Sequence, residues 1–140
     1  MKVVAKVLIL DSKNRMLILE RSGTHPEFPH HFDLPGGEVE LNEDTSQAVS
    51  REIYEETGLK IPAKKIKLLF NKKINNNLHH LLLITKINKK DPNLSISWEH
   101  CNSFWLTKTE LLGRSLPKNA DSYYKNVIDY LGSIDWDILN

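Results

Sequence analysis

The chain has 140 residues, and its 40% hydrophobic and 26% charged residues are typical of a globular protein with one core. Nineteen lysines and arginines against 18 aspartates and glutamates leave a formal charge of +1, which excludes a global attraction to polymeric nucleic acid or to a membrane surface. The single cysteine, Cys101, excludes a disulfide within the chain, and we expect its thiol to be buried or half-buried. We expect one domain over residues 1–140 and a cytoplasmic location, because the sequence shows no targeting signal and no apolar run of about 20 residues.

The charges are unevenly distributed along this nearly neutral chain. Carboxylates crowd into residues 38–56, whereas lysines crowd into residues 60–90. A local acidic cluster in a neutral protein indicates either a bound cation or a solvated helix face.

The first half of the chain predicts two strands, a loop and a helix. Residues 2–10 and 16–20 are β-rich runs joined by a polar turn, and we expect them to pair as a hairpin. Residues 21–35 contain three prolines and a glycine, which predicts a loop. Residues 42–57 predict a helix that is capped by Asn42, Asp44 or Thr45, carries acidic residues in its first turn and stops at Gly58.

The second half predicts further strands and two helices. Residues 64–74 and 78–87 predict a second strand pair, and residues 94–98 and 103–106 are weaker strand candidates. Residues 107–112 predict a short helix with Thr107 as its cap and Glu110 at its third helical position, and residues 121–131 predict a terminal helix. This order predicts an α/β (α+β) fold in which helices pack on the faces of a mixed sheet.

Three carboxylates of the first predicted helix fall at positions i, i+3 and i+4. At this spacing Glu52, Glu55 and Glu56 share one helix face within a turn, where like charges repel. Arg51 can pair with Glu55 at i+4, but one arginine cannot offset three carboxylates. A hard divalent cation such as Mg²⁺ or Mn²⁺ can, because these ions prefer oxygen ligands. A solvated acidic face gives the same pattern, so the three carboxylates alone leave both interpretations open.

The segment from Gly37 to Leu59 resembles the Nudix box, Gly-x5-Glu-x7-Arg-Glu-U-x-Glu-Glu-x-Gly-U, where U is a bulky aliphatic residue. Every fixed position is filled at the right spacing, by Gly37, Glu43, Arg51, Glu52, Ile53, Glu55, Glu56, Gly58 and Leu59. The resemblance implies a Nudix-type αβα sandwich, with a mixed β-sheet between helices. It also implies a hydrolase that cleaves a diphosphate linkage with Mg²⁺, or with Mn²⁺ as the alternative ion.

The resemblance further implies roles for the charged residues of the box. Glu52, Glu55 and Glu56 would hold the metal ions, together with the carbonyl oxygen of Gly37. A box glutamate can also serve as the general base that activates water. Arg51 would orient one of the glutamates through an ion pair.

The remaining box positions and the preceding glycine have structural or substrate-facing roles in this resemblance. Glu43 would brace the junction between loop and helix, and Gly58 would end the helix. Gly36 and Gly37 would let the backbone turn sharply and approach the substrate closely.

Three residues outside the box are further candidates for the site. Glu99 is the best downstream candidate for the general base, with an exposed glutamate at a strand end as the alternative. Arg21 is a candidate phosphate ligand, because the guanidinium fork suits phosphate; a plain surface arginine is the alternative. Asn119 is a candidate contact to a nucleotide base, with a turn residue before the last helix as the alternative.

The rest of the sequence says less about the substrate. Marks of the ADP-ribose, dinucleoside polyphosphate, NADH and coenzyme A subfamilies are missing, and the short chain is most similar to MutT-type nucleoside triphosphate pyrophosphohydrolases. We therefore expect a small nucleotide substrate: a (deoxy)nucleoside triphosphate, oxidised purine nucleotides included, split into monophosphate and pyrophosphate.

Two alternatives to this activity stay open. The first is hydrolysis of a nucleotide sugar or a dinucleoside polyphosphate, and the second is a non-catalytic Nudix-fold module that binds nucleotides for regulation. A homodimer is compatible with the resemblance. Trp98, Trp105 and Phe28 have the aromatic rings that stacking on a base requires, but in a domain of this size we expect such rings in the core.

Overall fold

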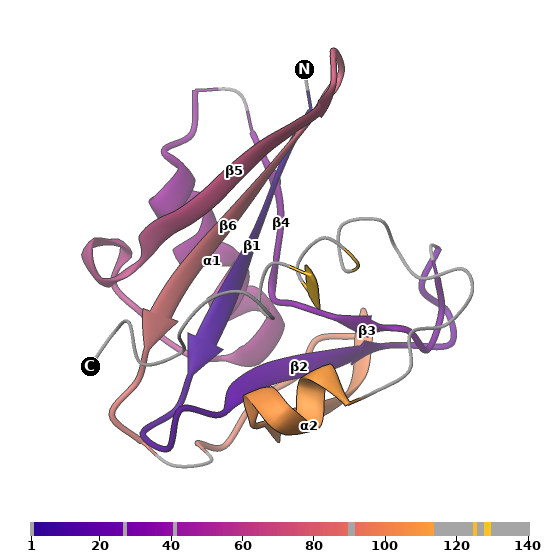
Figure 1. Ribbon diagram of the computed structural model, residues 1–140, viewed down its shortest axis with the longest axis vertical. Coiled ribbons are helices and arrows are strands. Elements are labelled where there is room, and N and C mark those ends of the chain that lie inside the picture. Colours follow the sequence, from indigo (N-terminus) through magenta and orange to yellow (C-terminus); the bar gives the residue numbers. More distant parts are fainter. Residues whose placement is uncertain are drawn as a thin grey trace.

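A seven-stranded mixed sheet forms the centre of the computed structural model, which describes residues 2–26, 28–40, 42–89, 92–113, 125, 128 and 129. The elements in chain order are β1 Lys2–Leu10, β2 Met16–Arg21, β3 Phe32–Asp33, β4 Gly36–Val39, α1 Thr45–Thr57, a 3-10 turn at Ala63–Lys65, β5 Lys67–Asn75, β6 Leu78–Lys86, β7 His100–Leu106 and α2 Lys108–Leu112. The strands follow the order β3-β2-β1-β6-β5, with β4 paired to β1 and β7 paired to β2 (Figure 1).

Strand β1 has different neighbours from those expected of a hairpin. It runs parallel to β6 along its whole length, from Lys2 opposite Leu78 to Leu10 opposite Lys86. On its other side it pairs with β4, and it meets β2 only where Leu10 lies opposite Met16. The predicted hairpin is therefore wrong beyond its turn, because β2 swings away to pair with β3 and β7. As Figure 1 shows, β2 and β4 diverge on this side of β1.

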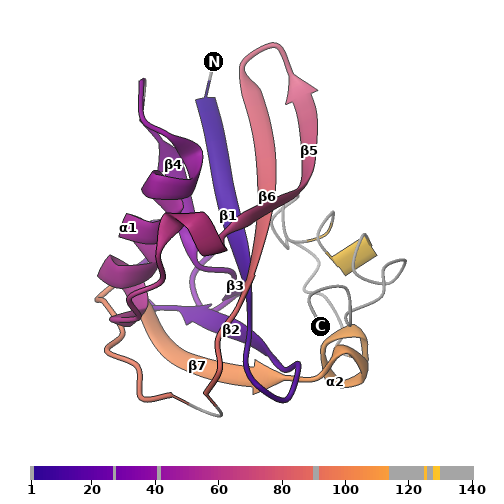
Figure 2. The same cartoon turned by 90° about the vertical axis from the view of Figure 1, so that its left-hand side faces the viewer.

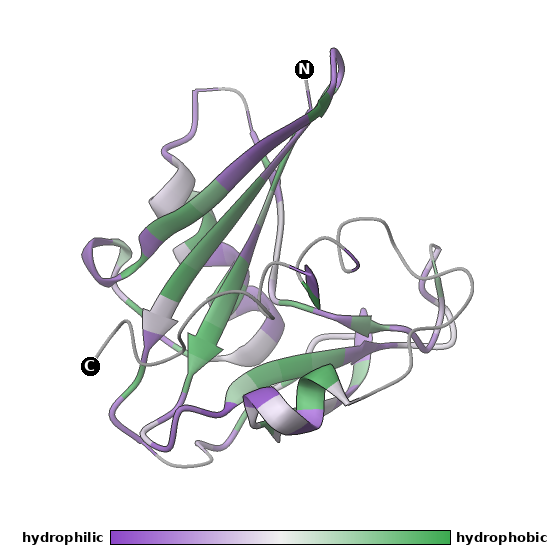
Figure 3. Ribbon diagram, viewed as in Figure 1, coloured by the Kyte–Doolittle hydropathy of each residue, from purple (hydrophilic) through white to green (hydrophobic). Residues whose placement is uncertain are grey.

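The alternation of side chains along β1 builds two cores on opposite faces of the sheet. Val7 and Ile9 pack with Val49 and Ile53 of α1. On the other face Leu8 and Leu10 pack with Leu111 of α2, and Ile128 also lies against this cluster. The two helices consequently lie on opposite sides of the sheet (Figure 2), and the apolar residues concentrate along its central strands (Figure 3). This arrangement confirms the expected sandwich of helices around a mixed sheet.

The ends of the helices follow from their caps. Asp44 caps α1 by accepting a hydrogen bond from the Gln47 amide at 3.1 Å, so the helix begins later than predicted and its first turn carries no acidic residue. Asn42 lies outside the helix, with a left-handed φ of 68°. Gly58 ends α1 with a φ of 78°, a conformation that favours glycine. Helix α2 has the predicted capping box between Thr107 and Glu110.

Five other expectations for the secondary structure have mixed outcomes. The pair β5–β6 is confirmed, although β5 begins at Lys67 after the 3-10 turn. Residues 94–98 do not form the predicted strand, and the amides of Ser95 and Ser97 instead donate to the last carbonyls of α1. The predicted loop contains the short strand β3, and residues 103–106 belong to β7. Of the predicted terminal helix, the described residues 125, 128 and 129 are helical. No helix in the described part of the chain is long and apolar enough to cross a membrane.

A buried charge network joins β1, β2, β3 and β7. Asp33 is 6% exposed, and its carboxylate oxygens lie 3.3 Å from Lys6 Nζ, 3.4 Å from Arg21 Nε and 3.1 Å from His100 Nε2. Burial alone would raise the pKa of Asp33, but Lys6, His100 and Arg21 outweigh burial and hold this pKa well below its usual range. The network therefore fixes four strands around one ionised carboxylate.

Replacing Asp33 by asparagine should lower the free energy of unfolding by about 3–5 kcal/mol near neutral pH, because Lys6 and Arg21 would then be buried without their compensating charge. The lowered pKa of Asp33 means that its carboxylate stabilises the fold fully above the unfolded pKa of about 4, and progressively less as the pH falls below that value. The difference between wild type and Asp33→Asn should therefore shrink in acid.

Urea unfolding at several pH values measures this difference, and Asp44→Asn is the matched control. Asp44 is an exposed helix cap, a position where asparagine serves as well as aspartate. If Asp33→Asn cost no more stability than the control, the buried network would not have the energetic role described here.

Candidate active site

The three box glutamates lie at different depths along α1. Glu56 is 4% exposed, Glu52 is half-buried, and the side chain of Glu55 is 55% exposed. The three carboxylates therefore lie at increasing exposure, from Glu56 in the core through Glu52 to Glu55 at the surface, and do not form one tight cluster. Among the described residues, the tight set of three donors that could hold an ion is a different one, formed by Glu20, His30 and Cys101.

Glu56 is a buried carboxylate with little compensating charge. Its Oε2 accepts a hydrogen bond from the Gly36 amide at 3.1 Å. The pKa of Glu56 is raised to about 8, mainly by burial and also by the charges of Asp33 and Glu52, whereas Lys6 and the Gly36 amide oppose the rise. Burial lowers the pKa of Lys6, but Asp33 and Glu56 outweigh it, so the net shift is upward and the ammonium stays charged. A second cation beside Glu56 would relieve this cost of burial.

Glu52 lies near two other parts of the chain, Glu99 and Gly37. Burial raises the pKa of Glu52 against the opposing charge of Arg51, and the charges of Glu55 and Glu99 raise it further. Glu99 therefore lies near enough to Glu52 for its charge to affect the pKa of Glu52. A Cβ added to Gly37 would lie 3.3 Å from Glu52 Cδ, so the glycine lets this carboxylate lie against the backbone of β4.

Arg51 forms ion pairs that connect Glu43, in the loop before α1, with two glutamates of the helix. Its Nη2 lies 3.1 Å from Glu43 Oε2, and its Nη1 lies 3.2 Å from Glu52 and 3.4 Å from Glu55. Glu43 in turn accepts a hydrogen bond from the Glu40 amide at 3.1 Å. The pairing of Arg51 with Glu55 agrees with the i+4 spacing, but the bidentate contact to Glu43 is the closer one and joins loop to helix.

Gly36 allows β4 to pass close to β1. Its φ is 127°, and a Cβ at this position would overlap the carbonyl oxygen of Ala5 on β1. Only glycine fits such a position. The close approach sets the Gly36 amide where it reaches Glu56, and it sets the Gly36 carbonyl oxygen 3.3 Å from Lys6 Nζ.

A cavity of about 530 Å³ lies beside these carboxylates. Its lining combines cationic, anionic and glycine residues that are far apart in the sequence: Lys2, Lys6, Arg21, Gly36, Gly37, Glu56 and Glu99. Arg21 is 5% exposed, and its guanidinium lies 5.7 Å from the centre of the Phe28 ring. The alternative of a plain surface arginine is therefore wrong. Asn119 lies outside the described residues.

Several cavity residues have no motif in the sequence. Lys6, Asp33 and His80 line the cavity, and only Lys6 carries a signal, because a lysine inside an apolar strand needs a buried partner. Trp98 also lines the cavity and is 70% exposed, so its expected place in the core is wrong, whereas Trp105 does pack against the core.

Cys101 likewise differs from its expected environment. Its thiol is exposed and lies at the surface, where Sγ donates to Glu20 Oε2 at 3.1 Å. The Cys101 side chain therefore lies at the surface beside β2, outside both hydrophobic cores.

Comparisons with known proteins agree with this geometry. The model of the NUDIX domain family matches residues 1–131. Among curated proteins, the chain is 46% identical over 57 residues to an ADP-ribose pyrophosphatase of Methanocaldococcus jannaschii, a match that covers 41% of this chain and 32% of that protein. It is 37% identical over 60 residues to the m7GpppN-mRNA hydrolase NUDT17 of Danio rerio, covering 43% of this chain and 20% of that protein. The matches thus span a third or less of these curated relatives.

A solved structure extends the likeness to almost the whole chain. The MutT protein of Methanosarcina mazei Go1 superposes with a TM-score of 0.69 at 24% identity, and the superposition covers 94% of this chain and 92% of that one. This likeness shows the fold, and the family model together with the complete box shows the family. The chain belongs to the Nudix family and has the domain of a Nudix hydrolase.

Proposed function

We propose that this Nudix hydrolase splits a (deoxy)nucleoside triphosphate into monophosphate and pyrophosphate with Mg²⁺, or with Mn²⁺ in its place. The observation that carries the proposal is the composition of one cavity, in which Glu56 and Glu99 face three cationic side chains, Lys2, Lys6 and Arg21. Carboxylates suit a divalent cation, and the cationic side chains suit a chain of phosphates.

The residues present fit a hard divalent cation. Glu52, Glu55 and Glu56 offer only oxygen donors, and the Gly37 carbonyl oxygen is of the same kind. Glu56 is buried with a raised pKa, and such a carboxylate gains most from a neighbouring cation. These four residues would between them hold the metal ions, which when bound neutralise phosphate charge and lower the pKa of a water molecule.

The chain itself supplies the remaining functions. Arg51 orients Glu52 and Glu55 while Glu43 braces it from the loop. Glu99 is the proposed general base, because it lines the cavity and its charge reaches Glu52. Arg21 is the proposed phosphate ligand, since its guanidinium is held in place by Asp33.

The proposed contacts to the nucleoside come from Trp98, the two glycines and Asn119. Trp98 is an exposed ring at the cavity, and exposed rings of this kind stack on bases. Gly36 and Gly37 leave room for the substrate against the backbone. Asn119 stays a proposed base contact outside the described residues.

Two other activities follow from the same site. A nucleotide sugar or a dinucleoside polyphosphate presents the same diphosphate group to the cavity, and the names of the curated relatives point to ADP-ribose and capped mRNA for those proteins. A non-catalytic module is disfavoured, because every glutamate of the box is present.

A nucleotide panel with Mg²⁺ or Mn²⁺ distinguishes these substrates by their products. We expect pyrophosphate and monophosphate from nucleoside triphosphates, at a kcat/KM at least about tenfold above that for ADP-ribose, a dinucleoside polyphosphate or a cap analogue. Turnover of one of the latter three without release of pyrophosphate from any triphosphate would refute the triphosphate assignment but leave the hydrolase intact.

Replacing Glu56 by glutamine tests the catalytic use of the box. The change keeps the shape of the side chain but removes its charge, so kcat/KM should fall by about a hundredfold or more. Glu40→Gln is the matched control, because Glu40 is exposed, and its activity should stay within about twofold of wild type. Thermal unfolding of both variants checks the fold, and wild-type turnover by a folded Glu56→Gln protein would exclude metal-dependent catalysis at this box.

A further inference from the structure

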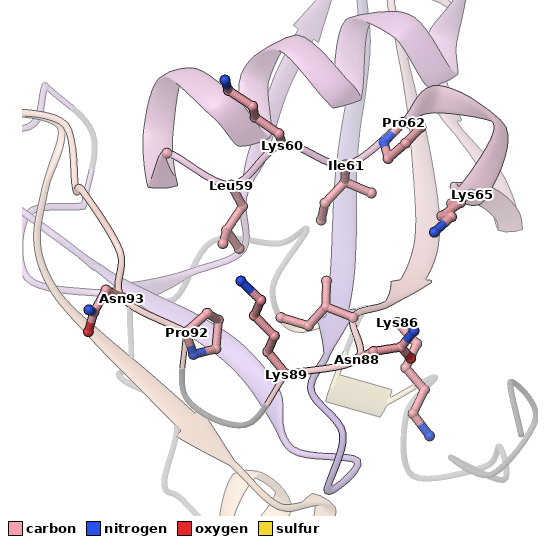
Figure 4. A pocket seen from close by; sticks show the side chains of 12 residues that line it. Leu59, Lys60, Ile61, Pro62, Lys65, Lys86, Asn88, Lys89, Pro92 and Asn93 are labelled. Carbon is pink, nitrogen blue, oxygen red and sulfur yellow. The ribbon is translucent and has the colours of Figure 1, made fainter.

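A second cavity among the described residues lies apart from the catalytic one. It has a volume of about 720 Å³, within the roughly 300–1,000 Å³ usual for small-molecule sites. One wall is the segment that follows α1, from Gly58 to Pro62 with Lys65, and the other wall consists of the last residue of β6 and residues after it, Lys86 to Lys89 with Pro92 and Asn93 (Figure 4). The described linings of the two cavities have no residue in common.

The lining of this cavity is apolar in its middle and positively charged at its walls. Leu59, Ile61 and Ile87 supply the apolar surface, and Ile61 is only 5% exposed. All charged residues that the structure describes in the lining are lysines. In Figure 4, Lys65 and Lys89 point into the cavity from opposite walls.

The other two lysines of the lining point away from its centre. Figure 4 shows Lys60 and Lys86 directed outward, and Lys60 Nζ lies 5.8 Å from the centre of the Tyr54 ring. Lys65 and Lys89 are thus the cations that a ligand inside the cavity would meet. Lys90 and Asp91, which follow Lys89 in the sequence, carry opposite charges and add no net charge.

The crowding of lysines into residues 60–90 has no part in the catalytic site described above, where the cations come from residues 2, 6 and 21. Two ammonium groups on the walls of one apolar hollow favour the binding of an anion there. Asn88 and Asn93 add amide groups to the rim, and each amide offers both donors and an acceptor.

We propose that this cavity binds an organic anion that has a flat apolar body and one phosphate group, of the nucleoside monophosphate class. The phosphate lies between Lys65 and Lys89, and the body lies on Leu59, Ile61 and Ile87. Charge complementarity selects the anion, and the apolar floor selects an organic body over inorganic phosphate.

A short segment of the chain links this cavity to the catalytic one. Pro92 and Asn93 line this cavity, whereas Trp98 and Glu99 line the catalytic one. Between them, the Ser95 amide donates to the Thr57 carbonyl at 2.8 Å and the Ser97 amide donates to the Glu56 carbonyl at 3.2 Å. One short segment therefore connects the proposed ligand with the proposed general base.

Methyl NMR of isoleucine-labelled protein tests the proposal with AMP as the probe, in buffer with EDTA so that no divalent cation recruits AMP to the box. We expect saturable shifts of the Ile61 and Ile87 methyl signals. Lys65→Gln with Lys89→Gln should weaken AMP binding at least about tenfold, since each removes a charged contact to phosphate. Adenosine, which lacks the phosphate, should bind wild type more weakly by a similar factor.

The double variant Lys67→Gln with Lys73→Gln is the matched control. It removes the same charge from exposed positions on β5 outside the cavity, and AMP affinity should change less than about twofold. The proposal is overturned if the two methyl signals do not approach saturation by about 10 mM AMP, or if both double variants weaken binding equally. No turnover is measured, so either result leaves the proposed hydrolysis untouched.

Discussion

The burial of one carboxylate, Glu56, constrains the rest of the site. Removing a carboxylate from water is costly unless charge or hydrogen bonds compensate it, and here the compensation is a single amide of Gly36 together with the nearby ammonium of Lys6. Lys6 is itself buried and needs Asp33, whose ion pairs reach β2 and β7. The acidic face of the helix and the strands of the sheet are therefore parts of one electrostatic arrangement. An arrangement that leaves Glu56 short of positive charge is suited to accept a cation.

The topology of the sheet explains why this arrangement lies at a cavity. Strand β1 exchanges neighbours along its length, from β4 near Lys6 to β2 at Leu10. Side chains of both neighbours and of the segment before β7 can therefore converge beside α1. Gly36 is the position that makes the exchange possible, because a side chain there would overlap β1. The conformational freedom of one glycine thus serves both strand pairing and the hydrogen bond to Glu56.

The sequence predicted the local elements of this site better than its long-range partners. The spacing from Gly37 to Leu59 places the helix, its terminal glycine and the pairing of Arg51 with Glu55, because these depend on residues close in the chain. The pairing of β1 with β6 could not be predicted, since an apolar alternation marks a strand without naming its neighbour. Lys6 was a readable signal, as a charge within an apolar run. No feature of the sequence indicates that Trp98 is exposed, because its position depends on a segment that backbone hydrogen bonds hold to the end of α1.

The central claim is that the buried end of the acidic helix face takes a divalent cation. Anomalous diffraction from crystals soaked in Mn²⁺ tests it most directly, because Mn²⁺ replaces Mg²⁺ at oxygen ligands and is located independently of the refined coordinates. The account predicts an ordered ion within coordination distance of the carboxylates of Glu52 and Glu56. An ordered Mn²⁺ found only at the surface cluster of Glu20, His30 and Cys101, with the box empty in the presence of a nucleotide, would contradict it.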